Sequence, residues 1–186
     1  MTEDDRELPP YPLDVDRLLG TIASHRVEYV LVGGTALVIY GAIDRVTFDL
    51  DVVPARSRAN LERLAAALNE LGARVISAWG PDTGELVVER IALTADLFEA
   101  NPFLHLLTDA GRVDVMLTPD GVPGGFDELV TNTNEAIVGG TPILIAALDD
   151  LVAMKRVVDR GKDRDDLDHI ARRRARGDGP DAPAAG

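Results

Sequence analysis

The sequence contains no cysteine, and this absence removes several classes of chemistry at once. Without cysteine, the chain has no disulfide bonds, no thiolate ligands for a metal ion and no cysteine nucleophile. It also lacks any apolar run close to the roughly 20 residues that a membrane-spanning helix needs. The N-terminal segment MTEDDRELPPYP is acidic and proline-rich, unlike a secretory signal peptide. We therefore expect a cytoplasmic protein with no membrane partner.

Basic residues are scarce as well, with 19 Lys and Arg against 32 Asp and Glu and a net charge of −13. This balance argues against non-specific nucleic-acid binding by overall charge. The charge is unevenly spread, because residues 151–186 carry nine basic and seven acidic residues, which gives +2 and leaves −15 for residues 1–150. The basic cluster of Arg172, Arg173, Arg174 and Arg176 is either a phosphate contact or a solvated helix end, and the second interpretation is the simpler one.

Length and composition predict one globular domain. The chain has 186 residues, of which 46% are hydrophobic and 27% charged, as in ordinary soluble domains. We expect a flexible arm over residues 1–12, one domain over 13–176 and a disordered tail over 177–186, which has no means of burying itself. Within the domain, residues 13–145 would form a catalytic α/β core and residues 146–176 two C-terminal helices.

Strand and helix patterns alternate along the chain. Helices are expected over 13–26, 35–40, 57–71, 126–130, 147–159 and 163–174. Strands are expected over 28–32, 49–53, 74–77, 135–138 and 143–145, with a hairpin that joins 103–108 to 112–117. Residues 79–100 show no clear pattern apart from a strand signal within 86–93. Because a hairpin is combined with strands that alternate with helices, we predict an α/β fold with a mixed sheet and flanking helices.

Two aspartates in one predicted strand are the strongest chemical signal. Asp49 and Asp51 are two positions apart, so their side chains point to the same face of the strand. Adjacent carboxylates repel each other, and burial makes the charged form more costly still. A divalent cation is the natural compensation, although solvent-facing positions on a half-exposed strand are the alternative.

A third aspartate makes the metal interpretation stronger. Asp114 lies in the run RVDVML, where alternation places Val113, Val115 and Leu117 on the core face and Asp114 on the other. Aspartate is disfavoured in strands, so two strands that each contain it are unusual. If these strands are neighbours in the sheet, the three carboxylates form the kind of cluster that binds Mg²⁺ or Mn²⁺ together with substrate phosphates.

A glycine turn stands between the first strand and the next helix. Gly33 and Gly34 allow backbone N–H groups to approach a triphosphate, and Thr35 can add a hydroxyl group. On its own, such a turn is more often only a turn. Its proximity in sequence to the aspartate pair favours a nucleotide-binding role.

The combination of the glycine turn, Arg45-Val46-Thr47 and Asp49-Leu50-Asp51 resembles the signature of the nucleotidyltransferase superfamily. The run LDDLVAMKRVVDRGKDRDDLDHI is similar to the toxin-type branch, namely the AbiEii family and its MenT relatives. The resemblance implies a nucleotidyltransferase fold and Mg²⁺-dependent transfer of an NMP from an NTP to an acceptor, which in several such toxins is the 3′ end of tRNA. It also implies that Asp49 and Asp51 bind metal and that Asp114 activates the acceptor hydroxyl. A cognate antitoxin protein is the implied partner.

Other polar residues have two interpretations each. Lys155 interrupts the apolar stripe of its helix, so it either reaches the triphosphate or snorkels out from the edge of the stripe. Arg45 is a nucleotide-phosphate contact or a surface arginine. Asp163 and Asp166 are expected to cap and begin the last helix, and the alternative is that they hold Lys155 or Arg160 in place. The three histidines, His25, His105 and His169, have no spacing typical of metal ligands.

Thr47 precedes the aspartate pair by two residues and would share its face if the strand extended that far. In the related toxins a hydroxyl residue at this place is phosphorylated by the antitoxin, so Thr47 is a candidate regulatory site. The function that we predict is a nucleotidyltransferase toxin that modifies tRNA. The alternatives are transfer to a protein or to a small-molecule hydroxyl, and a non-catalytic nucleotide-binding module.

Overall fold

The structure is a computed structural model that describes residues 12–79 and 86–176. The expected tail over 177–186 lies outside these residues, as does the expected arm except for residue 12. In the described part of the chain, no helix combines the length and the apolar character that crossing a membrane requires.

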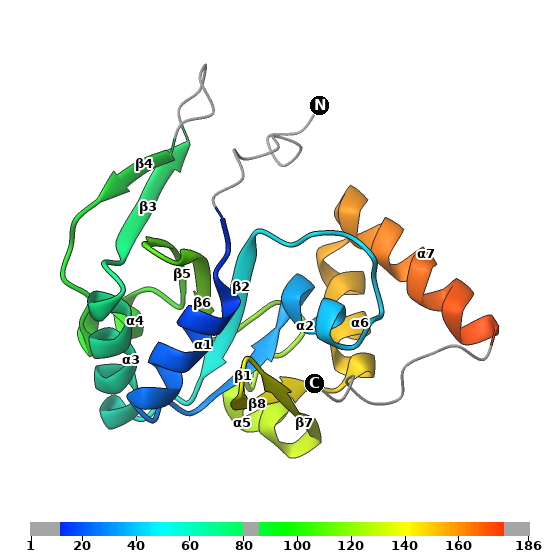
Figure 1. Cartoon of the computed structure of the whole chain (residues 1–186), viewed down its shortest axis with the longest axis horizontal. Coiled ribbons are helices and arrows are strands. Elements are labelled where there is room, and N and C mark those ends of the chain that lie inside the picture. Colours follow the sequence, from blue (N-terminus) through cyan, green and yellow to red (C-terminus); the bar gives the residue numbers. More distant parts are fainter. Residues whose placement is uncertain (1–11, 80–85, 177–186) are drawn as a thin grey trace.

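One mixed sheet of eight strands forms the centre of the molecule (Figure 1), in the order β4-β3-β5-β6-β2-β1-β8-β7. Two neighbouring pairs, β1 with β8 and β2 with β6, are parallel, and the other pairs are antiparallel. This confirms the predicted α/β fold with a mixed sheet. The strands are β1 (Tyr29–Val32), β2 (Asp49–Pro54), β3 (Arg74–Trp79), β4 (Leu86–Glu89), β5 (Phe103–Thr108), β6 (Gly111–Met116), β7 (Thr133–Val138) and β8 (Thr141–Ala146).

Helices lie on both sides of this sheet, with α1, α3 and α4 on one side of the view in Figure 1 and α2, α6 and α7 on the other. The last two helices confirm the predicted helical C-terminal part. The helices are α1 (Val15–Ser24), α2 (Gly33–Ile39), α3 (Arg58–Glu70), α4 (Ala95–Ala100), α5 (Phe126–Leu129), α6 (Leu148–Val158) and α7 (Gly161–Ala175), together with the 3-10 helix η2 (Val130–Asn132).

Local sequence explains most of these elements. In α3, the side chain of Ser57 accepts a hydrogen bond from the N–H of Asn60 and caps the helix, as predicted. Leu61, Leu64 and Leu68 form the buried stripe of that helix. Strand β1 is buried at all four positions, since it lies inside the sheet between β2 and β8. These apolar residues belong to one continuous core.

One stretch left without a clear pattern contains a helix, and two expectations were wrong in detail. Helix α4 lies in the stretch 79–100 for which no helix was predicted, and Thr94 caps it by accepting from the N–H of Leu97. Helix α7 begins after Arg160, so Asp163 lies in its first turn and does not cap it. Strand β6 begins at Gly111, so the hairpin turn contains two residues, and Thr108 pairs with Gly111.

Candidate active site

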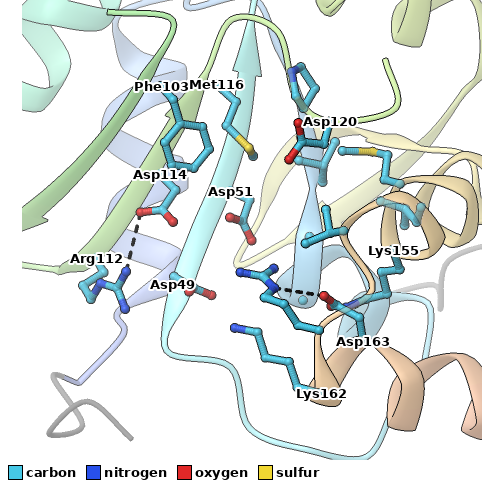
Figure 2. A pocket seen from close by; sticks show the side chains of 18 of the residues that line it. Asp49, Asp51, Phe103, Arg112, Asp114, Met116, Asp120, Lys155, Lys162 and Asp163 are labelled. Atoms are coloured by element: carbon cyan, nitrogen blue, oxygen red, sulfur yellow. Dashed lines mark hydrogen bonds and ion pairs between the residues drawn. The ribbon is translucent and has the colours of Figure 1, made fainter. Parts of the chain in front are cut away.

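The aspartates of β2 and β6 are brought together by the backbone pairing of these parallel strands. Asp51 is the direct partner of Asp114, and Asp49 is the partner of Arg112. Because opposite residues of neighbouring strands share a face, all four side chains point to one side of the sheet. Two strands about sixty residues apart in sequence therefore place three carboxylates on one face of the sheet, where they line one pocket (Figure 2).

A pocket of about 1030 Å³ lies over this face of the sheet. Strands β2, β5 and β6 form its floor, α6 and the start of α7 form a wall, and the loop before β2 forms another. Seven of the nine residues predicted to take part in catalysis, metal or nucleotide binding, or regulation line it: Gly33, Gly34, Arg45, Asp49, Asp51, Asp114 and Lys155. Thr35 and Thr47 are not among the lining residues. The structure thus gathers most of the expected site in one place.

The close contact between Gly33 and Asp51 explains the glycine turn. A Cβ atom at Gly33 would lie 1.8 Å from Oδ2 of Asp51, and Gly33 has a φ of +71°, which also favours glycine. The backbone N–H of Gly34 donates a hydrogen bond to the Asp51 carboxylate. The turn therefore positions the second aspartate of the pair, a role that the sequence pattern did not indicate.

Burial and the neighbouring charges of Asp49 and Asp114 raise the pKa of Asp51 well above its ordinary value. The charge of Lys162 and the hydrogen bond from Gly34 act in the opposite direction but do not cancel this effect. Asp51 therefore lies in surroundings that already hold more negative charge than they can easily stabilise. A bound cation would relieve this cost.

Thr35 and Thr47 form a polar link beneath the pocket. The hydroxyl of Thr35 donates to the backbone carbonyl of Asp49 at 2.8 Å and lies 3.0 Å from the hydroxyl of Thr47. Thr35 is buried and Thr47 is half-buried in the loop before β2. The two hydroxyl groups thus tie helix α2 to the start of the strand that carries the aspartate pair.

Lys155 lies in a partly buried group of charges that we call the ion cluster, made of Arg45, Lys155, Arg160, Asp163 and Asp166. Its Nζ atom is 2.6 Å from Oδ1 of Asp163 and 2.8 Å from Oδ2 of Asp166. Arg45 binds both oxygens of Asp166 at 2.8 Å, and Arg160 binds Asp163 at 3.0 Å. The ion cluster joins the loop before β2 to helices α6 and α7.

Several residues of the site had not been predicted. His105 on β5 lies opposite Asp114, and its Nδ1 atom is 3.0 Å from Asp114 Oδ1. Arg112 is buried, and a guanidinium nitrogen lies 3.7 Å from the same oxygen. Lys162 on α7 extends into the pocket toward the aspartates (Figure 2). The sequence did contain a signal for His105, because a hairpin with a two-residue turn places this residue directly opposite Asp114.

The oxygen atoms of the three carboxylates are the kind of ligand that a hard divalent cation prefers. In residues 12–79 and 86–176, no three acidic or histidine side chains are arranged closely enough to hold an ion by themselves. Magnesium often takes only one or two carboxylates and completes its coordination with substrate phosphates and water. Asp49 and Asp51 fit that pattern because they line one pocket, with Asp114 next to Asp51 on the neighbouring strand.

Comparison with known proteins gives one family match. The model of the family described as "Nucleotidyl transferase AbiEii toxin, Type IV TA system" matches residues 17–184. No curated protein sequence matches the chain.

Two solved structures align with this chain at low identity. The antibiotic-resistance factor ANT(2″)-Ia has a TM-score of 0.52 and 15% identity, covering 83% of this chain and 79% of that chain. A Thermotoga maritima protein described as a nucleotidyltransferase has a TM-score of 0.47 and 13% identity, covering 95% of this chain and 99% of that chain. At such identities the first similarity concerns the fold alone.

Proposed function

The chain belongs to the AbiEii family of nucleotidyltransferase toxins, whose model matches most of its length, and we propose that it transfers an NMP from an NTP to the 3′ end of an RNA, with tRNA as the acceptor. In the proposed reaction, the acceptor hydroxyl oxygen forms a bond to the α-phosphorus while the bond from that phosphorus to pyrophosphate breaks. The proton of the hydroxyl group passes to a carboxylate of the enzyme, and pyrophosphate leaves. We place this reaction in the cytoplasm, where NTPs and tRNA occur together.

The observation that carries the proposal is the backbone pairing of Asp51 with Asp114 next to the Gly33–Gly34 turn. It supports a reaction at a phosphorus atom because it collects carboxylates for a cation beside a glycine turn open to a phosphate chain. A bound Mg²⁺ or Mn²⁺ would supply Lewis-acid stabilisation of the negative charge on the reacting phosphate. Asp49, Asp51 and Asp114 are the residues that would hold it.

We assign different roles to the three carboxylates. Asp49 and Asp51 lie on one strand, and Asp51 is fixed by the N–H of Gly34, so these two suit binding of the metal-bound nucleotide. Asp114 lies one strand further from the glycine turn and is only 6% exposed. It suits the acceptor hydroxyl, because a carboxylate within hydrogen-bond reach can take the proton as the new bond forms.

The basic side chains of the pocket are assigned to the triphosphate. Arg45 keeps part of its guanidinium exposed while it binds Asp166, so it can present N–H groups to phosphate oxygens. We propose that Lys155 stabilises charge on the leaving pyrophosphate, either directly or through its place in the ion cluster. Gly33 and Gly34 would contact the phosphates through their backbone, and Thr35 would act by fixing the start of β2.

The charge of the pocket is compatible with an anionic acceptor, although the chain as a whole is acidic. Five basic residues line the pocket, Arg45, Arg112, Lys155, Arg160 and Lys162, and five acidic residues do so, Asp49, Asp51, Asp114, Asp120 and Asp163. The pocket is therefore formally neutral in a protein of net charge −13. Cation binding to the carboxylates would make it positive, which favours RNA over a polycationic small molecule.

The test is incubation of the protein with each labelled NTP, Mg²⁺ and total RNA, with Asp49→Ala as the control. We expect label in a band of tRNA size with the wild type and none with the variant. Label on protein would support the second candidate, transfer to a protein hydroxyl. Absence of label from every fraction would contradict the enzyme and favour a nucleotide-binding module.

We also propose that a cognate antitoxin regulates the enzyme by phosphorylation of Thr47. A phosphate on Thr47 would break its hydrogen bond with Thr35 and add negative charge beside Asp49, whose strand begins two residues later. We therefore expect loss of NTP binding in the modified protein. Mass spectrometry of protein co-expressed with its neighbour gene checks this, and neutralised toxin with unmodified Thr47 would contradict it.

A further inference from the structure

The floor of the pocket continues beyond Asp114 onto β5. In the sheet, β6 stands between β2 and β5, and the register places His105 opposite Asp114 and Phe103 opposite Met116. The Gly33–Gly34 turn follows β1, on the other side of β2. The carboxylates therefore separate two parts of one pocket, the glycine turn on one side and the β5 residues on the other.

Two rings form the β5 side of the pocket. The ring centroids of Phe103 and His105 are 4.6 Å apart, with an angle of 75° between the planes. The imidazole of His105 is held by its contact with Asp114, whereas Phe103 is 45% exposed and lies beside Met116 in the pocket (Figure 2). An exposed phenylalanine at the floor of a pocket, supported by a second ring, is suited to stack on a flat ring of a ligand.

The contacts of Asp114 are consistent with an acceptor hydroxyl that approaches from the β5 side of the pocket. His105 and Arg112 both approach Oδ1, at 3.0 Å and 3.7 Å. Both contacts are made to Oδ1, and the other carboxylate oxygen lies on the side of Asp51 in the pocket (Figure 2), where an acceptor hydroxyl could reach it. A group stacked on Phe103 would lie one strand away from that oxygen.

Resting on the proposed nucleotidyltransferase function, we propose that Phe103, supported by His105, stacks the terminal base of a single-stranded RNA acceptor and thereby delivers its hydroxyl to Asp114. Every nucleobase has a π face, so stacking binds RNA ends of different sequence. The guanidinium of Arg112, which lines the pocket on this side, complements the phosphodiester on the 5′ side of this base. The NTP occupies the opposite part, beside the glycine turn.

The test uses Phe103→Ala in the full chain, with a synthetic single-stranded RNA and the NTP that the wild type uses. We expect the KM for RNA to rise about 5- to 150-fold, the range that loss of one base–aromatic stack gives. The KM for the NTP should stay within about twofold, because Phe103 is remote from the glycine turn. Phe103→Leu keeps an apolar side chain without the ring and should recover only a small part of the loss.

Ile137→Ala is the matched control, since Ile137 is 58% exposed on β7 at the far edge of the sheet. It should leave the KM for RNA unchanged. The inference is overturned if Phe103→Ala leaves the KM for RNA unchanged, if it raises both KM values equally, or if Phe103→Leu behaves like the wild type.

Failure of the proposed function has a separate readout. If the wild type labels no RNA, equilibrium binding of the same oligonucleotide, followed by fluorescence anisotropy, decides the inference on its own. Weaker binding by Phe103→Ala than by Ile137→Ala would then support an RNA-binding role for this surface. Equal binding by the wild type and both variants would overturn it.

Discussion

Asparagine in place of Asp51 is expected to abolish nucleotidyl transfer and to stabilise the metal-free protein. The variant keeps the shape of the side chain and its hydrogen bond from Gly34, but it removes a charge that the cation requires. Loss of several kcal/mol of transition-state stabilisation corresponds to a fall in kcat of about 10³-fold or more. We regard this as the largest effect of any single substitution in the site.

The gain in stability follows from the raised pKa of Asp51. A carboxyl group whose pKa is higher in the folded state stabilises the protein fully below its unfolded pKa of about 4, and this contribution is lost as the pH rises through the folded pKa. At neutral pH the metal-free wild type therefore carries the cost of an ionised Asp51 between Asp49 and Asp114. Asparagine avoids that cost.

Thermal unfolding at pH 7 and pH 4, with and without Mg²⁺, measures both effects. Without metal at pH 7, Asp51→Asn should unfold a few degrees above the wild type, and the difference should narrow at pH 4, where the wild-type carboxyl takes up its proton. Mg²⁺ should raise the midpoint of the wild type more than that of the variant. Glu89→Gln, an exposed change of equal charge, is the control. A variant less stable than the wild type at pH 7 would contradict the prediction.

The second large effect is expected for Lys155→Met, in stability. Asp163 and Asp166 are 1% and 4% exposed at their side chains, and Lys155 lies between them. Methionine keeps the aliphatic part of the lysine but leaves the two buried carboxylates with less compensating charge. Breaking a buried ion pair in this way lowers the free energy of unfolding by about 3–5 kcal/mol. The exposed parts of Arg45 and Arg160 favour the lower end of that range.

The pH dependence of stability identifies the cause. Burial works to raise the pKa of Asp163 and of Asp166, but hydrogen bonds from Lys155, Arg160 and Arg45 outweigh it and the net pKa of each is lowered. Their contribution is therefore present above the unfolded pKa of about 4 and is lost as the pH falls through the folded values. In Lys155→Met this loss should begin at higher pH.

Urea unfolding between pH 3 and pH 7 checks this prediction. Arg156→Met removes the same charge from an exposed position on the same helix, α6, and should change the free energy of unfolding by less than about 0.5 kcal/mol. Equal stability of Lys155→Met and Arg156→Met would show that the ion cluster contributes nothing net to the fold.

The parts of the fold that the sequence predicted are those with local signals. Alternation in β2 and β6 identified Asp49, Asp51 and Asp114 as residues on one face, since the period of a strand is two. Helix α3 was predicted from equally local features, namely the cap residue Ser57 and the leucine stripe. The pairing of Asp51 with Asp114 required only that these two strands be neighbours.

The parts that were not predicted depend on contacts between distant residues. Arg45 and Asp166 are 121 positions apart, so no pattern within either segment indicates their ion pair. The position of His105 opposite Asp114 was not predicted, because the expected turn between β5 and β6 was one residue too long. A three-residue turn was expected, whereas the structure has a two-residue turn. A shift of one residue in a hairpin changes which side chains are opposite each other, and here it concealed the partner of Asp114.

The backbone pairing of β2 with β6 also determines where related chains are free to diverge. Backbone hydrogen bonds between these strands hold Asp51 against Asp114, whatever the length of the connection that links them. That connection includes β3 and β4, at one edge of the sheet, which extend away from the body of the molecule in Figure 1. Lengthening a surface hairpin costs little free energy. Evolution can therefore insert or remove residues there, and so acquire new binding specificity, without moving the carboxylates.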